Sequence, residues 1–259
     1  MYQIRLFFTA LQFFTRLPVP RWVGFEAEWL NHASRYFPLV GVVVAAIAAG
    51  TYALAAWLLP APVAAVLATA ATIYATGAFH EDGFADMCDG FGGGLTGQRV
   101  LEIMKDSRIG AYGAIGIVCM LVLKCVTLSL LPPGVAVAAL FVAHPLSRLT
   151  SGALIWRLDY ARDEGKAKPL ARKMSNGEFA IAVICALLPA AVCGVAGWLS
   201  WPALVASLLA ASASATWLAQ KCVSRIGGYT GDCLGAVQQV SEVTIYLCLL
   251  ASLGHGAWH

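Results

Sequence analysis

The sequence predicts an all-α protein that forms a polytopic membrane helix bundle, because it is rich in apolar residues and poor in charge. Of the 259 residues, 59% are hydrophobic and only 12% are charged, whereas soluble domains contain about 25% charged residues. So few charges cannot cover the surface of a soluble protein of this size. Disorder is excluded as well, because disordered chains combine low hydrophobicity with high charge. The net charge of +3 predicts no nucleic-acid partner.

The apolar residues gather in runs close to the length of about 20 residues that a helix needs to cross a bilayer. About seven transmembrane helices are therefore expected, over Phe37–Leu59, Val63–Phe79, Ala111–Leu131, Val135–Trp156, Phe179–Leu199, Trp201–Gln220 and the shorter Val240–Leu253. They form a single integral-membrane domain over residues 1–259, in contact with the lipid bilayer. The sequence is compatible with a homo-oligomer and does not define its order.

The segment that precedes the first span, residues 1–35, is expected to be interfacial. Its apolar run from Ile4 to Leu17 is too short to cross a bilayer and ends before Pro18. A helix that lies in the membrane interface and a helix that packs on the bundle both agree with this pattern. Residues 36–258 are expected to form the transmembrane bundle.

The distribution of charge predicts how the bundle is oriented. Uncharged turns connect the spans on one side, at residues 60–62, 131–134 and 199–202. The acidic residues are expected on the other side, with none near the middle of a span, in the N-terminal segment and the loops 80–110, 157–178 and 221–239. The basic residues follow the same distribution, apart from Lys124 and Arg148. Because an excess of Lys and Arg marks the cytoplasmic side, we expect these active-site loops to face the cytoplasm.

Three aspartates follow the second span at helical spacing. Asp82, Asp86 and Asp89 occupy positions i, i+4 and i+7, which share one face of a helix. Like charges at this spacing destabilise a helix, and a bound cation removes that cost. Carboxylate oxygens suit Mg²⁺, or Mn²⁺ as the alternative, and Mg²⁺ keeps positions open for the phosphates of a substrate. We therefore expect a divalent metal site, with a solvated acidic helix end as the competing interpretation.

The residues next to these aspartates have weaker assignments. Glu81 projects about 100° away from Asp82 on a helix, so it is the weaker metal candidate. His80 suits a hydrogen bond, a proton transfer or a helix cap better than it suits Mg²⁺. Glycine 90 and glycines 92–94 are expected to form a flexible loop whose backbone amides approach a phosphate.

A second charged group follows this glycine-rich stretch. Arg99, Glu102 and Asp106 are spaced i, i+3 and i+7, so they are expected on one helix face, as in a solvated amphipathic helix. Asp106 and Arg108 then precede the next span. A carboxylate that sets metal geometry and a guanidinium that clamps phosphate oxygens would together suit a pyrophosphate.

Two positions farther along the chain complete the candidate site. Arg148 lies about 12 Å inside the fourth span, about eight residues at 1.5 Å per residue before the expected last residue of that span, Trp156. Its guanidinium is expected either to line a polar cavity or to snorkel to the interface. Thr230 and Asp232 stand beside glycines where the last helix opens. Asp232 is expected either to cap that helix or to contact a substrate or metal.

These motifs resemble those of one known family. The run His80-Glu-Asp82-Gly-Phe-Ala-Asp86-Met-Cys-Asp89-Gly90 is similar to the HxDGxADxxDG motif of the adenosylcobinamide-GDP ribazoletransferases, or cobalamin synthases. Four further segments match in order, so that the resemblance covers essentially the whole chain: residues 13–20, 35–41, 102–113 and 230–236. Two departures are Glu81, where the family usually has an apolar residue, and Tyr229, where Gln is common.

The resemblance implies a Mg²⁺-dependent enzyme of the bacterial cytoplasmic (inner) membrane. Such enzymes join adenosylcobinamide-GDP to α-ribazole or its 5′-phosphate, release GMP and form adenosylcobalamin or its 5′-phosphate. The metal ligands would be Asp82, Asp86 and Asp89. The other implied catalytic residues are Asp106, Arg108 and Arg148, and the implied substrate-binding residues are His80, Glu102, Lys105, Thr230 and Asp232.

Two other functions compete for the same residues. A CDP-alcohol-type phosphotransferase would also place clustered aspartates at the end of a span, but it would carry a DGxxAR run. Here Asp82-Gly83 is followed by Phe84-Ala85-Asp86-Met87. An ion-coupled transporter, which is not an enzyme, would carry carboxylates near the middle of its spans. We therefore favour the cobalamin synthase interpretation.

Overall fold

The computed structural model describes residues 1–24, 26–161 and 173–254, which fold into helices joined by turns and loops. The all-α prediction is confirmed. The long helices are α3 (Phe37–Leu58), α4 (Ala61–Thr76), α5 (Phe79–Gly93), α7 (Ala111–Leu130), α8 (Pro133–Arg157), α9 (Asn176–Val195), α10 (Trp201–Ile226) and α11 (Gly231–Ser252). The shorter elements are α1 (Tyr2–Phe14), α2 (Ala27–Ala33), α6 (Gly97–Ile103) and the 3₁₀ turns Arg21–Val23 and Ser34–Tyr36.

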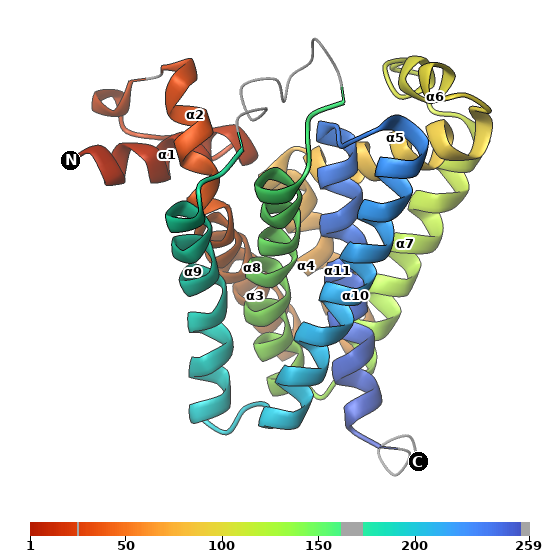
Figure 1. Ribbon diagram of the computed structural model, residues 1–259. Coiled ribbons are helices and arrows are strands. Elements are labelled where there is room, and N and C mark those ends of the chain that lie inside the picture. Colours follow the sequence, from red (N-terminus) through yellow and green to blue (C-terminus); the bar gives the residue numbers. More distant parts are fainter. Residues whose placement is uncertain (25, 162–172, 255–259) are drawn as a thin grey trace.

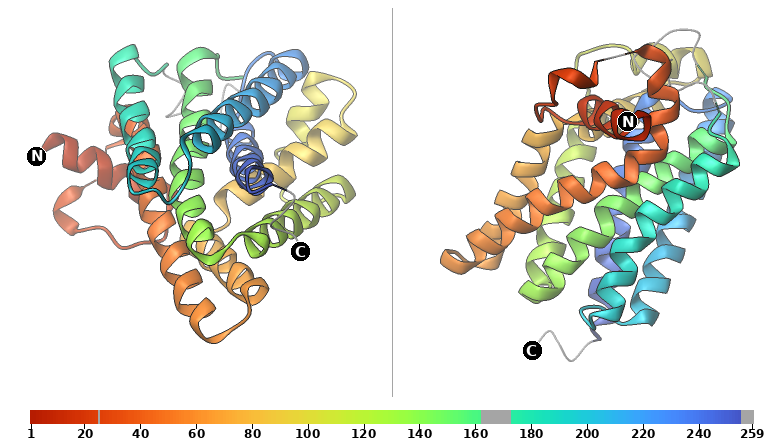
Figure 2. Two further views of the ribbon diagram at one scale, coloured as in Figure 1. Left: turned by 90° about the horizontal axis from the view of Figure 1, so that it is seen from below. Right: turned by 90° about the vertical axis from the view of Figure 1, so that its left-hand side faces the viewer.

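The long helices other than α5 run side by side, while α1, α2 and α6 gather at one end of the bundle (Figure 1). Figure 2 shows the same bundle seen along the helices and from the side. Helices α8 and α11 form its centre, because 78% and 72% of their apolar stretches are buried, against 22–39% in the other candidate spans. The outer helices expose apolar side chains such as Ile115, Leu188 and Leu209, as expected for a surface that faces lipid.

Six helices of the described chain are long and apolar enough to cross a membrane, and a seventh span results if the bent pair α4 and α5 is counted as one. The prediction of about seven spans agrees with this count. The second span was expected to run through Phe79, but α4 ends at Thr76. Gly77 (φ 65°) and Ala78 (φ 58°) both adopt left-handed conformations, and α5 leaves at 91° to α4. The helix that carries the aspartates is therefore turned away from the direction of α4.

The last helix differs from the expectation in its length and in its charge. It begins at Gly231 instead of Val240, and it contains Glu242 near its middle. The prediction that the middle of every span lacks a carboxylate is therefore wrong. Average hydropathy underestimates the length of this helix, because its polar side chains point into the bundle, where other helices cover them.

Helix α1 packs on the bundle through one face. Its buried side chains are Leu6, Thr9, Ala10, Leu11 and Phe14. The ring of Phe14 contacts those of Phe37 and Phe79, with centroids 4.3 and 5.2 Å apart. Of the two expected placements, packing on the bundle therefore holds for this face, while Tyr2 and Ile4 remain exposed.

Candidate functional site

The three aspartates of the sequence motif lie on α5, at the end of the bundle that also carries α1 and α6 (Figure 1). Asp82 is exposed, Asp86 is half-buried and Asp89 is buried. The helical spacing that we predicted is therefore present, but the three carboxylates have different surroundings.

Asp89 caps the following long helix. One of its oxygens accepts a hydrogen bond from the backbone N–H of Gly110 at 2.7 Å, and the other accepts one from Gly113 at 2.8 Å. A carboxylate at a helix N-terminus satisfies amides that have no partner within the helix and complements the helix dipole. Both oxygens of Asp89 thus hold α7 against α5. Its predicted role as a metal ligand stays a prediction.

Helices α5 and α11 approach each other at two glycines. A Cβ atom on Gly83 would lie 2.9 Å from the Cα atom of Asp232, and one on Gly235 would lie 2.9 Å from the carbonyl oxygen of His80. Only glycine permits such an approach. The contact places Asp232, in the first turn of α11, beside Gly83, which follows Asp82 on α5.

Thr230 is the N-cap residue of α11, and its hydroxyl accepts a hydrogen bond from the backbone N–H of Cys233 at 3.4 Å. Asp232 does not hold this position, so the alternative in which Asp232 is the cap is wrong. Both residues lie at the start of α11, the end that approaches α5 at Gly83. Their roles as site residues stay predictions. Thr230 is fully buried, whereas Asp232 is half-buried.

The glycine-rich stretch is not a flexible loop. Gly90 and Gly92 belong to α5, which ends at Gly93. A Cβ atom would meet the Met104 side chain at 2.4 Å from Gly90, and the Tyr112 ring at 2.5 Å from Gly92. These glycines serve close packing of α5 against the segments that follow it.

The charged residues after α5 lie largely in solvent. Arg99 pairs with Glu102 on α6 at 3.1 Å, but α6 ends at Ile103, so Asp106 does not share their helix face as predicted. Asp106 instead pairs with Arg108 at 2.6 Å. The hydrogen bonds from Arg108 lower the pKa of Asp106 to about 2, so the carboxylate stays ionised at neutral pH. Lys105 is also exposed.

Arg148 does not snorkel to the surface. Its side chain is 3% exposed, and one guanidinium nitrogen donates to the carbonyl oxygen of His144 at 3.0 Å. It lines a small cavity together with Phe14, His80 and Gly231, the first residue of α11. The imidazole of His80 is stacked on the Phe14 ring, with centroids 5.6 Å apart. The predicted polar cavity is therefore present in part, with one charged group in a mainly aromatic wall.

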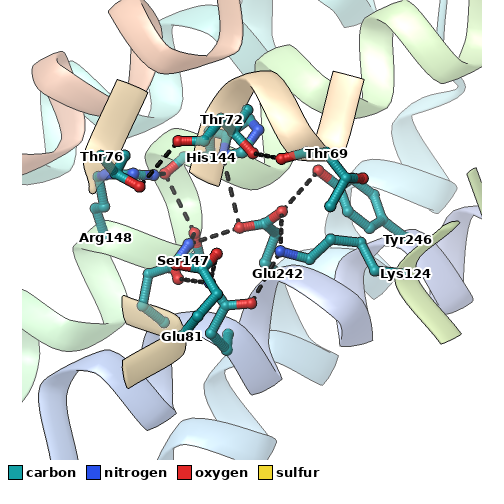
Figure 3. Close-up of polar contacts among 12 residues, drawn as sticks. Thr69, Thr72, Thr76, Glu81, Lys124, His144, Ser147, Arg148, Glu242 and Tyr246 are labelled. Atoms are coloured by element: carbon teal, nitrogen blue, oxygen red, sulfur yellow. Dashed lines mark hydrogen bonds and ion pairs between the residues drawn. The ribbon is translucent and has the colours of Figure 1, made fainter. Parts of the chain in front are cut away.

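A buried polar network in the centre of the bundle was missed by the sequence analysis (Figure 3). Lys124 on α7 forms an ion pair with Glu242 on α11 at 3.0 Å, and Tyr246 donates to the same carboxylate at 3.1 Å. Two sequence features could have revealed it. A lysine in the middle of a span needs a partner, and Gln238, Glu242 and Tyr246 recur every four residues along one helix face.

The donor set of α5 suits magnesium only in part. Within residues 1–24, 26–161 and 173–254, no group of three or more His, Cys, Asp and Glu side chains is arranged to hold a metal ion. Asp82 and Asp86 are nevertheless one helical turn apart, and neither is fully buried. Mg²⁺ is commonly held by one or two carboxylates, with phosphate oxygens and water as the remaining ligands. These two residues fit a metal that is completed by a substrate.

Comparisons with known proteins agree on one family. The family model for cobalamin-5-phosphate synthase matches residues 6–250. A protein from Leptothrix cholodnii named adenosylcobinamide-GDP ribazoletransferase is 47% identical, over 100% of this chain and 98% of its own. Proteins of the same name from Shewanella frigidimarina and Vibrio cholerae are 44% and 41% identical, and cover 96% and 98% of this chain and 95% and 96% of their own. No solved structure matches.

Proposed function

Because this chain belongs to the cobalamin-5-phosphate synthase family, we propose that it is an adenosylcobinamide-GDP ribazoletransferase. In this reaction a hydroxyl group of α-ribazole, or of its 5′-phosphate, attacks the phosphorus atom that is linked to cobinamide. A new P–O bond forms, the bond to the GMP oxygen breaks, and the hydroxyl proton is released. The products are GMP and adenosylcobalamin, or its 5′-phosphate.

The observation that carries this proposal is the pair Asp82 and Asp86 on α5, within the family motif and at one end of the bundle. We propose that these carboxylates hold Mg²⁺, or Mn²⁺ as the alternative, which when bound would neutralise charge on the pyrophosphate. Asp89 orders the start of α7 next to them through Gly110 and Gly113. Its role in this proposal is to fix the loop that leads from α6 into α7.

Two arginines are proposed to bind phosphate oxygens. Arg108 is 87% exposed and lies just before α7, so it can reach a substrate from the solvent side. Arg148 opens onto the small cavity beside the first turn of α11. A guanidinium can form two parallel hydrogen bonds to a phosphate, and preorganised donors of this kind stabilise a transition state most strongly where water is excluded.

The proposed location is the bacterial inner membrane, with α5, α6 and the start of α11 on the cytoplasmic side. Support comes from the charged residues, which gather at this end of the chain's spans, whereas the turns around Pro60, Pro132 and Ser200 lack charge. The positive-inside rule then predicts the orientation. Nucleotide-linked substrates such as adenosylcobinamide-GDP would reach the site from the cytoplasm.

The transporter alternative gains no support from the carboxylate that the structure places inside a span. Glu242 accepts hydrogen bonds from Gln238 at 2.6 Å and from Tyr246 at 3.1 Å, and it pairs with Lys124. The Nδ1 atom of His144 also lies 3.5 Å from this carboxylate. A carboxylate surrounded by so many partners suits a fixed structural role. The CDP-alcohol alternative is disfavoured by the family match, which covers nearly the whole chain.

Purified protein, incubated with adenosylcobinamide-GDP and α-ribazole, tests this proposal. We expect GMP and adenosylcobalamin to form in equal amounts when Mg²⁺ is present, and neither product to form after chelation of the metal. Replacing Mg²⁺ by Mn²⁺ tests the alternative metal. Release of GMP without adenosylcobalamin would contradict the assigned acceptor, whereas full activity with chelator would contradict the metal proposal.

A further inference from the structure

Helix α5 is tied to the bundle at both ends by carboxylates other than Asp82 and Asp86. Near its C-terminal end, Asp89 accepts the two backbone hydrogen bonds from the start of α7. In its first turn, Glu81 is buried and accepts a hydrogen bond from the side-chain amide of Gln239 on α11 at 3.0 Å. The acidic residues of this helix thus divide into an inward pair and a more exposed pair.

Gln239 connects Glu81 with the polar centre of the bundle. Its amide oxygen accepts from the Lys124 Nζ atom at 2.8 Å, while its amide nitrogen donates to Glu81 and, at 2.9 Å, to the Gln238 side chain. The side chain is buried on all sides. The Gln239 amide therefore has a single orientation that satisfies its neighbours. Exchange of its oxygen and nitrogen would place the amide nitrogen against the Lys124 Nζ atom, which is also a donor, and the amide oxygen against the acceptor oxygens of Glu81 and Gln238.

The far end of this connection is rigid. Lys124 is fixed by its ion pair with Glu242, and Glu242 is fixed in turn by Gln238 and Tyr246. Both oxygens of Glu242 have partners, and polar groups satisfied in this way in a low-dielectric interior stiffen the elements that carry them. The second oxygen of Glu81 is buried without a hydrogen-bond partner in the described part of the chain, so its bond to Gln239 is the contact that holds this carboxylate. Glu81 is consequently bound, through Gln239 of α11, to a group that does not move easily.

Glu81 and Asp82 are neighbours on the same helix and project about 100° apart. A rotation of α5 about its own axis would therefore move both side chains together. The glycine contact between Gly83 and Gly235 brings α5 close to α11, but glycines present a smooth surface that does not by itself prevent rotation. Asp89 limits rotation near the C-terminal end of α5, and the hydrogen bond to Glu81 supplies the corresponding constraint in the first turn, beside Asp82.

We propose that Glu81 is a positioning residue. Together with Gln239 and Lys124 it fixes the rotation of α5, and it thereby determines the direction in which Asp82 and Asp86 face. The geometric part of this inference stands on the contacts above, whereas its consequence for catalysis rests on the proposed function. It also assigns a role to the acidic residue that departs from the family pattern.

Cysteine labelling measures the rotation without metal or substrate. In a background that lacks the eight native cysteines, we would introduce Asp82→Cys at an exposed position and, separately, Ala85→Cys at a buried one. The ratio of their labelling rates with a membrane-impermeant maleimide reports which face of α5 is presented to solvent. Each ratio would then be measured again with Glu81→Met, with Gln239→Met and with both substitutions.

We expect each substitution to lower the ratio about fivefold, which corresponds to about 1 kcal/mol for one buried hydrogen bond. The double variant should show no further loss, because both substitutions remove the same contact. Glu81→Gln should keep the ratio, since its amide oxygen can accept the same bond. The matched control is Thr127→Val on α7, whose buried hydroxyl donates within its own helix, to the Leu123 carbonyl oxygen.

Unchanged ratios in Glu81→Met and Gln239→Met would overturn the proposal, as would a roughly 25-fold loss in the double variant from two independent fivefold effects. If Glu81→Met does not yield folded protein, Gln239→Met on α11 carries the same test. Turnover gives a second readout. We expect Glu81→Gln to stay close to wild type and Glu81→Met to lose kcat, whereas inactivity of Glu81→Gln, equal to that of Asp82→Asn, would make Glu81 a metal ligand instead.

These outcomes separate the inference from the proposed function. Wild-type protein that lacks ribazoletransferase activity but shows the expected labelling ratios would contradict the function and keep the positioning role. Active protein whose labelling ratios do not change would keep the proposed function and contradict the positioning role of Glu81.

Discussion

Lys124 on α7 and Glu242 on α11 form an ion pair of 3.0 Å in the centre of the bundle, where their side chains are only 3% and 2% exposed. Charges in a membrane interior are costly unless they are paired. Here each charge neutralises the other, and Gln239 and Tyr246 add hydrogen bonds to the pair. The pair fastens α7 to α11, the two helices that also flank α5.

Removal of one partner of this pair should destabilise the protein more than removal of both. We expect Lys124→Met and Glu242→Gln each to lower the free energy of unfolding by about 3–5 kcal/mol, because each leaves an uncompensated buried charge. The double variant should recover most of the loss. The measurement is unfolding in detergent followed by tryptophan fluorescence, and equal losses in single and double variants would contradict the prediction.

The carboxylates on the exposed side of α5 should be essential for turnover and unimportant for folding. We expect Asp82→Asn and Asp86→Asn each to abolish activity while the protein still inserts into the membrane and elutes as a single species. Glu28→Gln, at an exposed carboxylate on α2, is the matched control and should retain activity. Near-normal rates in either aspartate variant at saturating Mg²⁺ would remove that residue from the metal site.

Asp89 should behave differently from these two aspartates. Its carboxylate accepts two backbone N–H groups, and an asparagine can accept only one of them with its single oxygen. We expect Asp89→Asn to lower the free energy of unfolding by about 1–3 kcal/mol, the cost of an unsatisfied buried donor. The Mg²⁺ concentration that gives half-maximal activity should stay unchanged, and a large rise in that concentration would instead assign Asp89 to the metal.

The orientation of the bundle can be tested at three exposed positions. We expect a cysteine introduced at Leu95 or Ser224 to react with an impermeant maleimide only from the cytoplasmic side, and one introduced at Pro133 to react only from the opposite side. Permeabilised membranes, in which all three should react, serve as the control. Protection of Leu95→Cys from the cytoplasm would overturn the proposed orientation.

The sequence predicts the spans well because a run of about 20 apolar residues has few alternatives to a membrane helix. It predicts α11 poorly, since average hydropathy does not record the direction in which Gln238, Gln239 and Glu242 point. The break between α4 and α5 was missed for a related reason. Gly77 signals a helix end, but the left-handed conformation of Ala78 has no signal in the sequence.

The sequence proposes which residues belong to the candidate site, but it predicts only part of their arrangement in space. Asp82 and Asp86 could be placed on one face because they belong to a single helix. The partners of Asp89 lie 21 and 24 residues later in the chain, at Gly110 and Gly113. Contacts of this kind depend on how α7 packs on α5, which helical spacing does not determine.

Arg148 gives the sharpest test of how far the site extends into the bundle. Because its guanidinium is buried and bonds to the His144 carbonyl oxygen, Arg148→Lys keeps both the charge and a donor that can reach this oxygen. The lysine loses the planar fork that binds two phosphate oxygens at once. If a phosphate enters the cavity, the loss of one preorganised donor should cost about 2–4 kcal/mol of transition-state stabilisation, or roughly 30- to 1000-fold in kcat/KM.

We expect this loss for adenosylcobinamide-GDP, measured in matched detergent preparations with an unchanged free energy of unfolding. Ser151→Ala is the control, because Ser151 lines the same cavity and its hydroxyl donates to the Leu234 carbonyl oxygen of α11 at 2.8 Å. That variant should lose stability and keep most of its activity. Wild-type kinetics in Arg148→Lys would restrict phosphate binding to the solvent side of α5, and Arg108 would then be the remaining guanidinium of the proposed site.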